Sequence, residues 1–388
     1  MMKSVFVKVM AALVAVTVLC SCSALAPAKA QASALSKAKK VKIGLYIDKG
    51  ASGCGVLHLA SLIAHSPQAE LVTLMAQDIR DGKLKSLDVL VMPGGGSTTQ
   101  CLTVGLEHHD KIKNFIRQGG GYVGTCAGMF NVLQIPRRLH LLPFNRYWGA
   151  GGSTSNVTIE ISEQGAKVLG IKPGIRYVRY SGGPVAYAVN DPKLEGKGFS
   201  LATFKSGVAK NPKHATKFIG SVAAVYGTFG KGKVAATSFH PEYDEVNHDI
   251  MLGCFYAVSG VKLTPVYPKK NFRPIRVGVL ATGLNGHGPI WNMIDLERHP
   301  DLDVHYIMMT EINKGMLRHL DYLVMAHADG AVIKKYMTMP YSKAKLTEFV
   351  NNGGVILAAG NAADAVPNHK NVKKLPAKVD FKKYILKK

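Results

Sequence analysis

The chain has 388 residues, and its 49 Lys and Arg against 25 Asp and Glu give a formal net charge of +24. A surface this basic attracts anionic partners, but no nucleic-acid-binding motif accompanies the charge. We therefore expect no nucleic-acid partner, and we favour an anionic component of a cell envelope over a solvated surface without a specific partner.

The N-terminus has the features of a secretion signal. Lys3 and Lys8 accompany the apolar run Val9–Leu19, which is too short to span a bilayer stably. No later segment is long and apolar enough to do so. We expect an exported protein, periplasmic or membrane-anchored, in a bacterium.

Two cleavage sites compete in this signal. The sequence Leu-Cys-Ser-Cys at 19–22 resembles a bacterial lipoprotein box with Cys22 as the lipidated residue, whereas Ala-Lys-Ala at 28–30 fits ordinary signal peptidase. We prefer the lipoprotein because its box directly follows the apolar run. Residues 1–22 are then the signal peptide, residues 23–40 are a linker, and the lipid ties the protein to a membrane.

Residues 41–262 begin with short apolar strands that alternate with helical patterns. This alternation predicts a three-layer α/β fold in which helices cover both faces of a parallel sheet, with sites at the carboxyl ends of the strands. From Val157 onward the pattern changes to strands joined by turns, which predicts an antiparallel insertion. The expected strands and helices are 41–47, 56–65, 71–74, 89–92, 111–118, 122–123, 129–133, 157–161, 176–187, 199–204 and the hairpin 221–239.

The sequence from Gly119 to Gly128 reads Gly-Gly-Gly-Tyr-Val-Gly-Thr-Cys-Ala-Gly. It has the strand, tight turn and helix of a nucleophile elbow, with Cys126 at the nucleophile position. Small neighbours are needed because the nucleophile lies on a strained turn, and the helix that follows favours a thiolate. The alternative is a buried thiol in a glycine-rich turn.

Two distant segments favour the catalytic interpretation. His240 and Glu242 end an apolar run and lie two residues apart, so they face the same side of an extended chain, as a base and its orienting group would. Gly94 and Gly95 follow the strand at 89–92, and their backbone N–H groups can approach an oxyanion.

These three motifs, in this order, resemble the class I glutamine amidotransferase-like superfamily. The longer pattern around Cys126, with Tyr-Ser-Gly-Gly-Pro at 180–184, is most similar to the N-terminal domain of biotin-protein ligase. The resemblance implies a flavodoxin-like fold and a Cys126–His240–Glu242 triad. It also implies an oxyanion site at Gly94, Gly95 and Ala127, and a substrate pocket near Tyr180, Gly182 and Gly183.

Such a site performs nucleophilic acyl transfer. We predict that Cys126 attacks an amide or peptide carbonyl of a small molecule or envelope peptide and forms a thioester, with no cofactor and no metal. We do not expect ammonia transfer to a synthase, because no synthase domain follows in the sequence. The alternative is a ligand-binding or scaffolding lipoprotein that retains the triad without using it.

Four cysteines lie beyond the signal. Cys54 and Cys101 follow the first strand and the Pro-Gly-Gly loop, at the same edge of the predicted sheet. Because an exported protein meets oxidising conditions, we predict a Cys54–Cys101 disulfide. Cys254 is expected in the core of a helix.

Residues 263–274 form a linker rich in Pro and Lys, after which the pattern of the first region begins again. Residues 275–280 mirror 41–46, residues 320–325 mirror 87–92, and residues 349–355 mirror 115–122 with one residue removed. We predict that residues 275–365 are a second, shorter unit of the same fold. Its chemistry is missing, because Ala359 stands where the first region has Cys126.

Residues 366–388 form a basic tail. Within it, 379–386 intersperses apolar and Lys residues, and could be an edge strand or a flexible segment on an anionic surface.

Overall fold

The structure is a computed structural model. It describes residues 39–147, 153–208, 212–283, 286–329, 332–333, 335 and 339–387, so the expected signal peptide, Cys22 and nearly all of the linker to residue 40 lie outside the described residues. Lys40–Lys388 form one compact unit. None of the helices in the described ranges combines the length and the apolar character needed to cross a bilayer.

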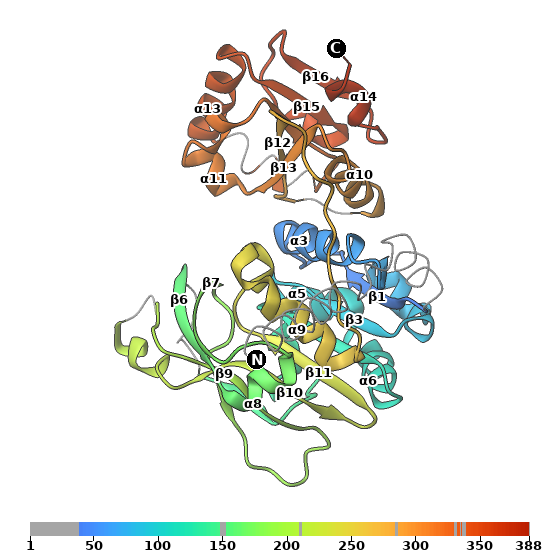
Figure 1. Ribbon diagram of the computed structural model, residues 1–388, viewed down its shortest axis with the longest axis vertical. Helices are drawn as coiled ribbons and strands as arrows, with labels where there is room; N and C mark the ends of the chain where they lie inside the picture. The colour runs from blue at the N-terminus through green and yellow to red at the C-terminus, as the bar shows by residue number, and fades with distance from the viewer. Residues whose placement is uncertain are drawn as a thin grey trace, which may run out of the picture. The chain divides into compact units, whose positions relative to one another are not determined.

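Residues 41–262, the large lobe, are built on a sheet with 11 strands in the described part of the chain (Figure 1). Its first part is parallel, in the order β2-β1-β3-β4-β11. The loops that follow β3, β4 and β11 therefore emerge at the same edge of the sheet. These strands are β1 (Val41–Tyr46), β2 (Ala69–Leu74), β3 (Val89–Met92), β4 (Gly121–Thr125) and β11 (Gly232–Thr237).

The second part of the sheet is antiparallel and continues from β11 in the order β10-β9-β6-β7. This is the insertion expected from the turn-rich sequence. The strand expected at 176–187 is divided, because the chain turns at Gly182, whose φ is +73°. The strands of this part are β5 (Phe144–Arg146), β6 (Thr154–Ile161), β7 (Gly174–Ser181), β8 (Ala186–Ala188), β9 (Lys197–Phe204) and β10 (Val222–Phe229).

Helices cover both faces of this sheet. Along β1, Ile43 and Leu45 belong to one hydrophobic cluster and Tyr46 to another, as the two-residue repeat of a strand requires. The first cluster contains residues of α3 (Gly53–Ala64), α8 (Glu163–Leu169) and α9 (His248–Ser259). The second contains residues of α4 (Ala76–Arg80), α5 (Ser97–Val104), α6 (His109–Arg117) and α7 (Ala127–Val132). The large lobe is therefore a three-layer α/β fold.

Residues 275–387, the small lobe, repeat the parallel part of the large lobe. Their sheet is parallel with the order β13-β12-β14-β15-β16, which corresponds strand by strand to β2-β1-β3-β4-β11. The packing is repeated as well: a Cβ atom at Gly44 would lie 2.4 Å from Leu87 Cδ1, and one at Gly278 would lie 2.3 Å from Leu320 Cδ1. The elements are β12 (Ile275–Leu280), α10 (His287–Glu297), β13 (Leu302–Ile307), α11 (Met309–Asn313), β14 (Tyr322–Met325), α13 (Pro340–Asn351), β15 (Val355–Ala359), β16 (Val372–Leu375) and α14 (Lys382–Ile385).

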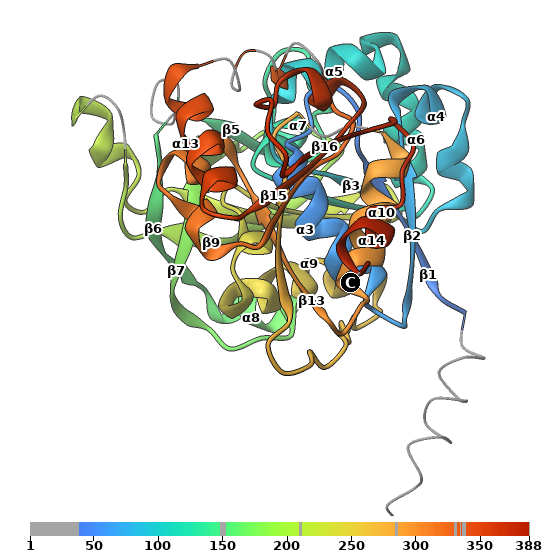
Figure 2. The same cartoon turned by 90° about the horizontal axis from the view of Figure 1, so that it is seen from above.

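The C-terminal segment is folded, and residues 379–386 form neither the edge strand nor the flexible segment that we had left open. The edge strand is β16, whereas residues 379–386 contain α14, which lies beside α10 (Figure 2). Phe381 and Ile385 are buried, and Asn292 Nδ2 of α10 donates to Val379 O at 2.8 Å. The apolar residues between the lysines of this segment therefore pack α14 onto the small lobe beside α10.

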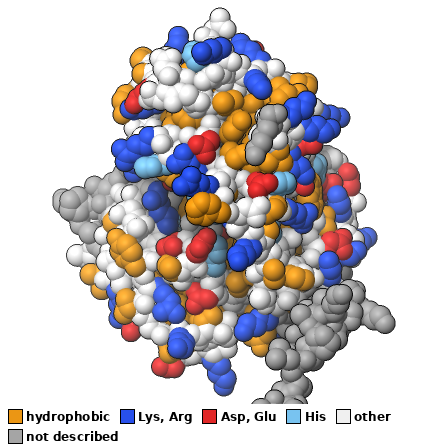
Figure 3. All heavy atoms as spheres, turned by 45° about the horizontal axis from the view of Figure 1, so that its top comes forward, with side chains coloured by type: hydrophobic (Ala, Val, Ile, Leu, Met, Phe, Trp, Pro, Cys, Tyr) orange, Lys and Arg blue, Asp and Glu red, His pale blue; other side chains and the backbone are white. Residues whose placement is uncertain are grey.

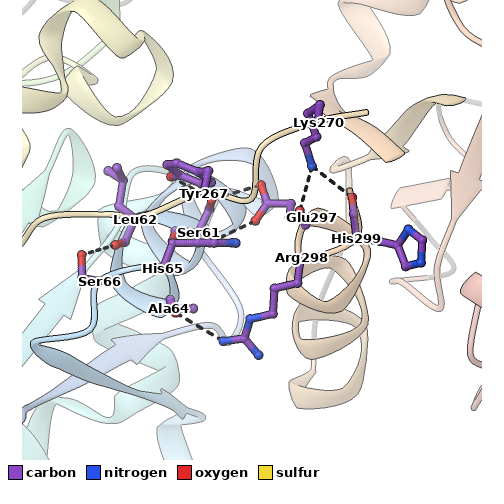
Figure 4. A network of polar contacts seen from close by, with 10 residues as sticks. All are labelled: Ser61, Leu62, Ala64, His65, Ser66, Tyr267, Lys270, Glu297, Arg298 and His299. Carbon is purple, nitrogen blue, oxygen red and sulfur yellow. Dashed lines mark hydrogen bonds and ion pairs between the residues drawn. The ribbon is translucent and has the colours of Figure 1, made fainter. Parts of the chain in front are cut away.

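The two lobes meet at α3, which packs against α10 and β13. Nine of the twelve α3 residues are buried, because the sheet lies on one side of the helix and the small lobe on the other. Polar contacts border this interface (Figure 4): Ser61 Oγ donates to Glu297 Oε1 at 3.0 Å, and Arg298 donates to Ala64 O at 3.3 Å. The linker contributes Tyr267, whose ring stacks on His65 at 4.4 Å between centroids.

Two helical glycines give a test of this packing with opposite expected signs. A Cβ atom at Gly165 of α8 would lie 2.2 Å from Leu201 O on β9, whereas one at Gly288 of α10 would meet no atom within 4 Å. We expect Gly165→Ala to lower the free energy of unfolding by about 2 kcal/mol, because the helix must move off the sheet. Gly288→Ala should raise it by about 0.5 kcal/mol through the lost entropy of the unfolded chain. Urea unfolding followed by circular dichroism measures both changes, and a shift of the same sign in both variants would contradict this packing.

Candidate active site

Cys126 lies at the sharp turn between β4 and α7. Its backbone has φ 51° and ψ −98°, a left-handed conformation that is strained for a residue with a side chain. Its amide donates to Thr237 O of β11 at 2.7 Å. The flanking glycines are required by contact, since a Cβ atom at Gly128 would lie 2.0 Å from Met92 O and one at Gly124 would lie 2.6 Å from the Gly128 carbonyl carbon. The glycine spacing around Cys126 thus has a steric cause.

His240 and Glu242 form a buried pair just after β11. His240 Nδ1 lies 2.9 Å from Glu242 Oε1, and the two residues are 3% and 0% exposed. Because an ionised carboxylate only accepts hydrogen bonds, Nδ1 donates and Nε2 is the ring nitrogen left for the thiol. Thr125 Oγ1 donates to the same carboxylate oxygen at 3.3 Å, and the His240 amide donates to Arg179 O of β7 at 2.8 Å. The pair is therefore fixed to both parts of the sheet.

The electrostatics of this site favour a charged imidazole. Burial of His240 opposes its protonation, but the charges of Glu242 and Cys126 and hydrogen bonds with both side chains outweigh it. Together they raise the pKa of His240 above its usual range. An imidazolium beside a thiol is the arrangement that activates catalytic cysteines.

The Pro-Gly-Gly loop lies against the same two side chains. A Cβ atom at Gly94 would lie 2.5 Å from His240 Cε1 and 3.4 Å from Cys126 Cβ, so only glycine permits this approach. The loop after β1 holds it in place, because Ser52 N donates to Gly94 O at 2.7 Å and Gly96 N donates to Gly50 O at 2.8 Å.

Three backbone amides near Cys126 are available as donors. Within the residues that the structure describes, no protein acceptor takes a hydrogen bond from the N–H of Gly94, Gly95 or Ala127. These are the amides that the sequence suggested for an oxyanion site, and a developing negative charge would satisfy them.

The Tyr-Ser-Gly-Gly-Pro segment reaches the site through its backbone and not through Tyr180. Tyr180 is fully buried, its hydroxyl donates to Gly183 O at 2.6 Å, and its ring packs edge-on against Phe204 and Phe218. Tyr180 is therefore a core residue, and our expectation that it lines a substrate pocket is wrong. The Cys126 thiol donates to Ser181 O at 3.6 Å. Gly182 and Gly183 form the turn after β7, and a Cβ atom at Gly183 would lie 1.9 Å from Ser238 O.

Tyr243 is a site residue that the sequence reasoning missed. Its ring stacks on the His240 ring, with centroids 4.5 Å apart and an interplanar angle of 11°. The Tyr243 ring also contacts the ring of His58 in α3, with centroids 5.2 Å apart. Burial lowers the pKa of His58 to about 3. The spacing in the sequence could have suggested this contact, because His240 and Tyr243 are three residues apart. Residues 241–243 form a 3₁₀ turn, and side chains at that spacing eclipse in such a helix.

The predicted disulfide is not formed, and Cys54 and Cys101 are free thiols. Both segments do leave the same edge of the sheet. However, Cys54 lies in α3 on one face, whereas Cys101 lies in α5 on the other and donates to Asn131 Oδ1 at 3.3 Å. Cys254 is fully buried in α9, as expected.

The corresponding place in the small lobe holds no such site. Ala359 ends β15, and a Cβ atom at the next residue, Gly360, would lie 2.3 Å from His327 Nδ1. The His327 ring therefore fills the space beside the turn. Across the described ranges of the chain, no group of three or more His, Cys, Asp or Glu side chains could hold a metal ion.

Comparison with known proteins gives relatives for part of the chain. The family described as "Biotin-protein ligase, N terminal" matches residues 42–133, which include Gly94 and Cys126 but not His240. The pyridoxal 5'-phosphate synthase subunit PdxT of Nocardia farcinica is 30% identical over 191 residues, covering 48% of this chain and 73% of that protein. Biotin–protein ligase of Schizosaccharomyces pombe is 28% identical over 188 residues, covering 43% of this chain and 27% of the ligase. The structure of PurLQS from Thermotoga maritima covers 57% of this chain and 98% of its own, with 15% identity and a TM-score of 0.41.

The pKa of His240 can be tested by alkylation of Cys126 with iodoacetamide, read by peptide mass spectrometry. In Glu242→Gln the largest of the influences that raise the pKa of His240 is removed, so this pKa falls and less of the imidazolium is present at pH 6.5. We expect the alkylation rate of Cys126 at that pH to fall about tenfold or more, because the thiol has lost its cationic partner.

The protein contains its own controls for this experiment. Burial raises the pKa of Cys101 to about 11 and that of Cys254 to about 12, so both should react slowly in either variant. An unchanged Cys126 rate in Glu242→Gln would show that the carboxylate does not act through His240.

Proposed function

Because the chain belongs to the class I glutamine amidotransferase-like superfamily, near the N-terminal domain of biotin-protein ligase, we propose that its large lobe hydrolyses or transfers an amide or peptide acyl group through a thioester on Cys126. The observation that carries the proposal is the buried His240–Glu242 pair, 2.9 Å apart, beside a cysteine on a strained turn. Strained nucleophile turns and buried charge pairs are costly and occur mainly where they serve a reaction.

The first half of the reaction forms the thioester. Cys126 Sγ attacks the carbonyl carbon, and the amides of Ala127 and Gly94 or Gly95 stabilise the oxyanion. His240 then gives its Nε2 proton to the leaving nitrogen as the carbon–nitrogen bond breaks. Glu242 holds the ring through Nδ1 and stabilises its positive charge.

The second half releases the acyl group. Neutral His240 accepts a proton from water or from an amine as that nucleophile attacks the thioester. The carbon–sulfur bond breaks, the thiolate of Cys126 is restored beside the imidazolium, and the product is an acid or a new amide.

The geometry favours a slender substrate. Cys126 is 4% exposed, and the Gly94 loop and the turn after β7 lie directly against the site. A terminal carboxamide or the end of a peptide side chain fits this access better than the main chain of a folded protein.

Release of ammonia or of a primary amine from a panel of glutamine, asparagine and peptide amides tests the proposal. Cys126→Ala should abolish activity, with a loss of at least about 10³-fold, and His240→Ala should lose about 10²–10⁴-fold. Gly94→Ala should also be impaired, because its new Cβ would displace the His240 ring.

The matched control is Cys254→Ala, which removes a buried thiol in α9 that takes no part in the proposed reaction. It should retain activity. A full panel without turnover, together with ligand affinity that persists in Cys126→Ala, would instead indicate a binding protein that retains the triad.

We also propose that the protein acts outside the cytoplasm as a lipoprotein anchored through Cys22. The support is the Leu-Cys-Ser-Cys sequence directly after the apolar run. In a bacterial host, labelling with an alkyne fatty acid should mark the wild type and not Cys22→Ser. A mature N-terminus just after Ala30 in the wild type would contradict the anchor and indicate ordinary signal-peptidase cleavage.

A further inference from the structure

A cavity of about 680 Å³ lies between the two lobes, and neither Cys126 nor His240 is among its lining residues. Residues of α3, β7 and the segment after Glu242 form the large-lobe wall of the cavity. Residues of β13 and α11 form the small-lobe wall, and the linker lines one side. This volume is in the range of sites that bind small organic molecules. The proposed reaction gives it no role.

The charge of the cavity is opposite to that of the protein. Lys and Arg outnumber Asp and Glu by 49 to 25 in the whole chain, yet the lining has more carboxyl groups than fixed cations. Acidic and histidine side chains can be seen around the hollow between the lobes in Figure 3. The carboxyl groups are those of Asp244, Glu245, Glu297, Asp303 and Glu311, and the fixed cations are Arg179 and Lys270.

Both walls carry groups that interact electrostatically. Glu311 of the small lobe and Cys54 of the large lobe both line the cavity, and the charge of Glu311 adds to the effect of burial, which raises the pKa of Cys54. One Glu311 oxygen accepts the amide of Met308 at 2.7 Å. Lys270 offsets part of this negative charge: its ammonium donates to Glu297 O at 2.8 Å and to His299 O at 3.3 Å, and it interacts electrostatically with Glu297 and Asp303.

Glu297 adds a buried carboxyl group to the wall of the cavity. The residue is 9% exposed and lines the cavity, and its Oε2 atom has no hydrogen-bond donor among the described residues. His65 Nδ1 lies 3.6 Å from this oxygen and also contacts Ser61 O at 3.0 Å. Burial raises the pKa of Glu297 to about 7, and the hydrogen bonds of Tyr306 and Ser61 and the charges of Lys270 and Arg298 offset this only in part.

The remaining walls are aromatic. Tyr243, Tyr267 and Tyr306 all line the cavity, and Tyr306 meets His58 edge-on at 5.2 Å. The faces of tyrosine rings attract ammonium groups, particularly where water is partly excluded. Carboxylates combined with aromatic rings are the composition expected of an amine site.

We propose that this cavity binds a small organic molecule through its ammonium group. The carboxylates of Glu311 and Asp303 supply the attraction on the small-lobe wall, and the tyrosine rings contact the methylene groups and the cation. The ligand is either a plain alkyl amine or an amino acid. In the second case Arg179, on the opposite wall, would hold the carboxylate.

This site is separate from the proposed acyl-transfer site. The Tyr243 ring stands between them, lining the cavity while stacking on His240. Binding therefore does not require the thiol, and Cys126→Ala should bind the amine as the wild type does. This makes the test independent of the proposed activity.

Isothermal titration of the protein with cadaverine, lysine and glutarate at pH 7.5 and low salt tests the proposal. Cadaverine and lysine should bind and glutarate should not. The double variant Glu311→Gln with Asp303→Asn should weaken cadaverine binding about tenfold, because it removes two charges and little volume. Glutamine at position 311 can still cap α11. Tighter binding of lysine than of cadaverine, lost in Arg179→Gln, would identify an amino-acid site, whereas equal binding would identify a plain amine site.

The matched control is Asp78→Asn. Asp78 caps α4 through the Met75 amide at 2.7 Å, as Glu311 caps α11, but it lies outside the cavity, so this variant should bind cadaverine normally. Glutarate binding without cadaverine binding would overturn the proposal. So would the absence of amine binding up to about 10 mM, or an unchanged affinity in the double variant.

Discussion

The pairing of β4 with β11 is the constraint on which the candidate site depends. Cys126 follows the first strand and His240 follows the second, and the whole antiparallel insertion lies between them in the chain. The parallel register sets Thr125 opposite Thr237, and the hydrogen bond from Cys126 N to Thr237 O continues it past the strand ends. A shift of one residue would turn the side chains of β11 to the other face and carry His240 away from the thiol.

Much of this site could be predicted from the sequence, because its main requirements are steric and only glycine fits at the closest contacts. Gly94 and Gly128 are fixed by contacts that no side chain could share, so their spacing around Cys126 is readable without coordinates. The repeat was readable for the same reason, since Gly44 and Gly278 meet equivalent leucines. The alternation of strands and helices predicted a parallel sheet covered on both faces, but not the order of its strands.

What the sequence could not supply is the face on which a residue lies. The sequence correctly placed Cys54 and Cys101 near one edge of the sheet. It did not predict that their helices, α3 and α5, cover opposite faces of that sheet. Tyr180 belongs to a motif near the site, yet its place in β7, on the same buried face as Val178, directs its ring into the core. The contact of the lobes, and with it the cavity, depends on two surfaces that are distant in sequence and have no shared motif.

The burial of α3 has a consequence for the behaviour of the whole chain. One hydrophobic cluster runs from Leu57 in this helix to Ile290 in α10, so the lobes share a core although a Pro- and Lys-rich linker joins them. With a shared core the two lobes are expected to unfold together as one cooperative unit, so the linker joins them without acting as a hinge. The small lobe therefore has a thermodynamic role: its loss would expose to water α3, the helix that packs against the turn carrying Glu242.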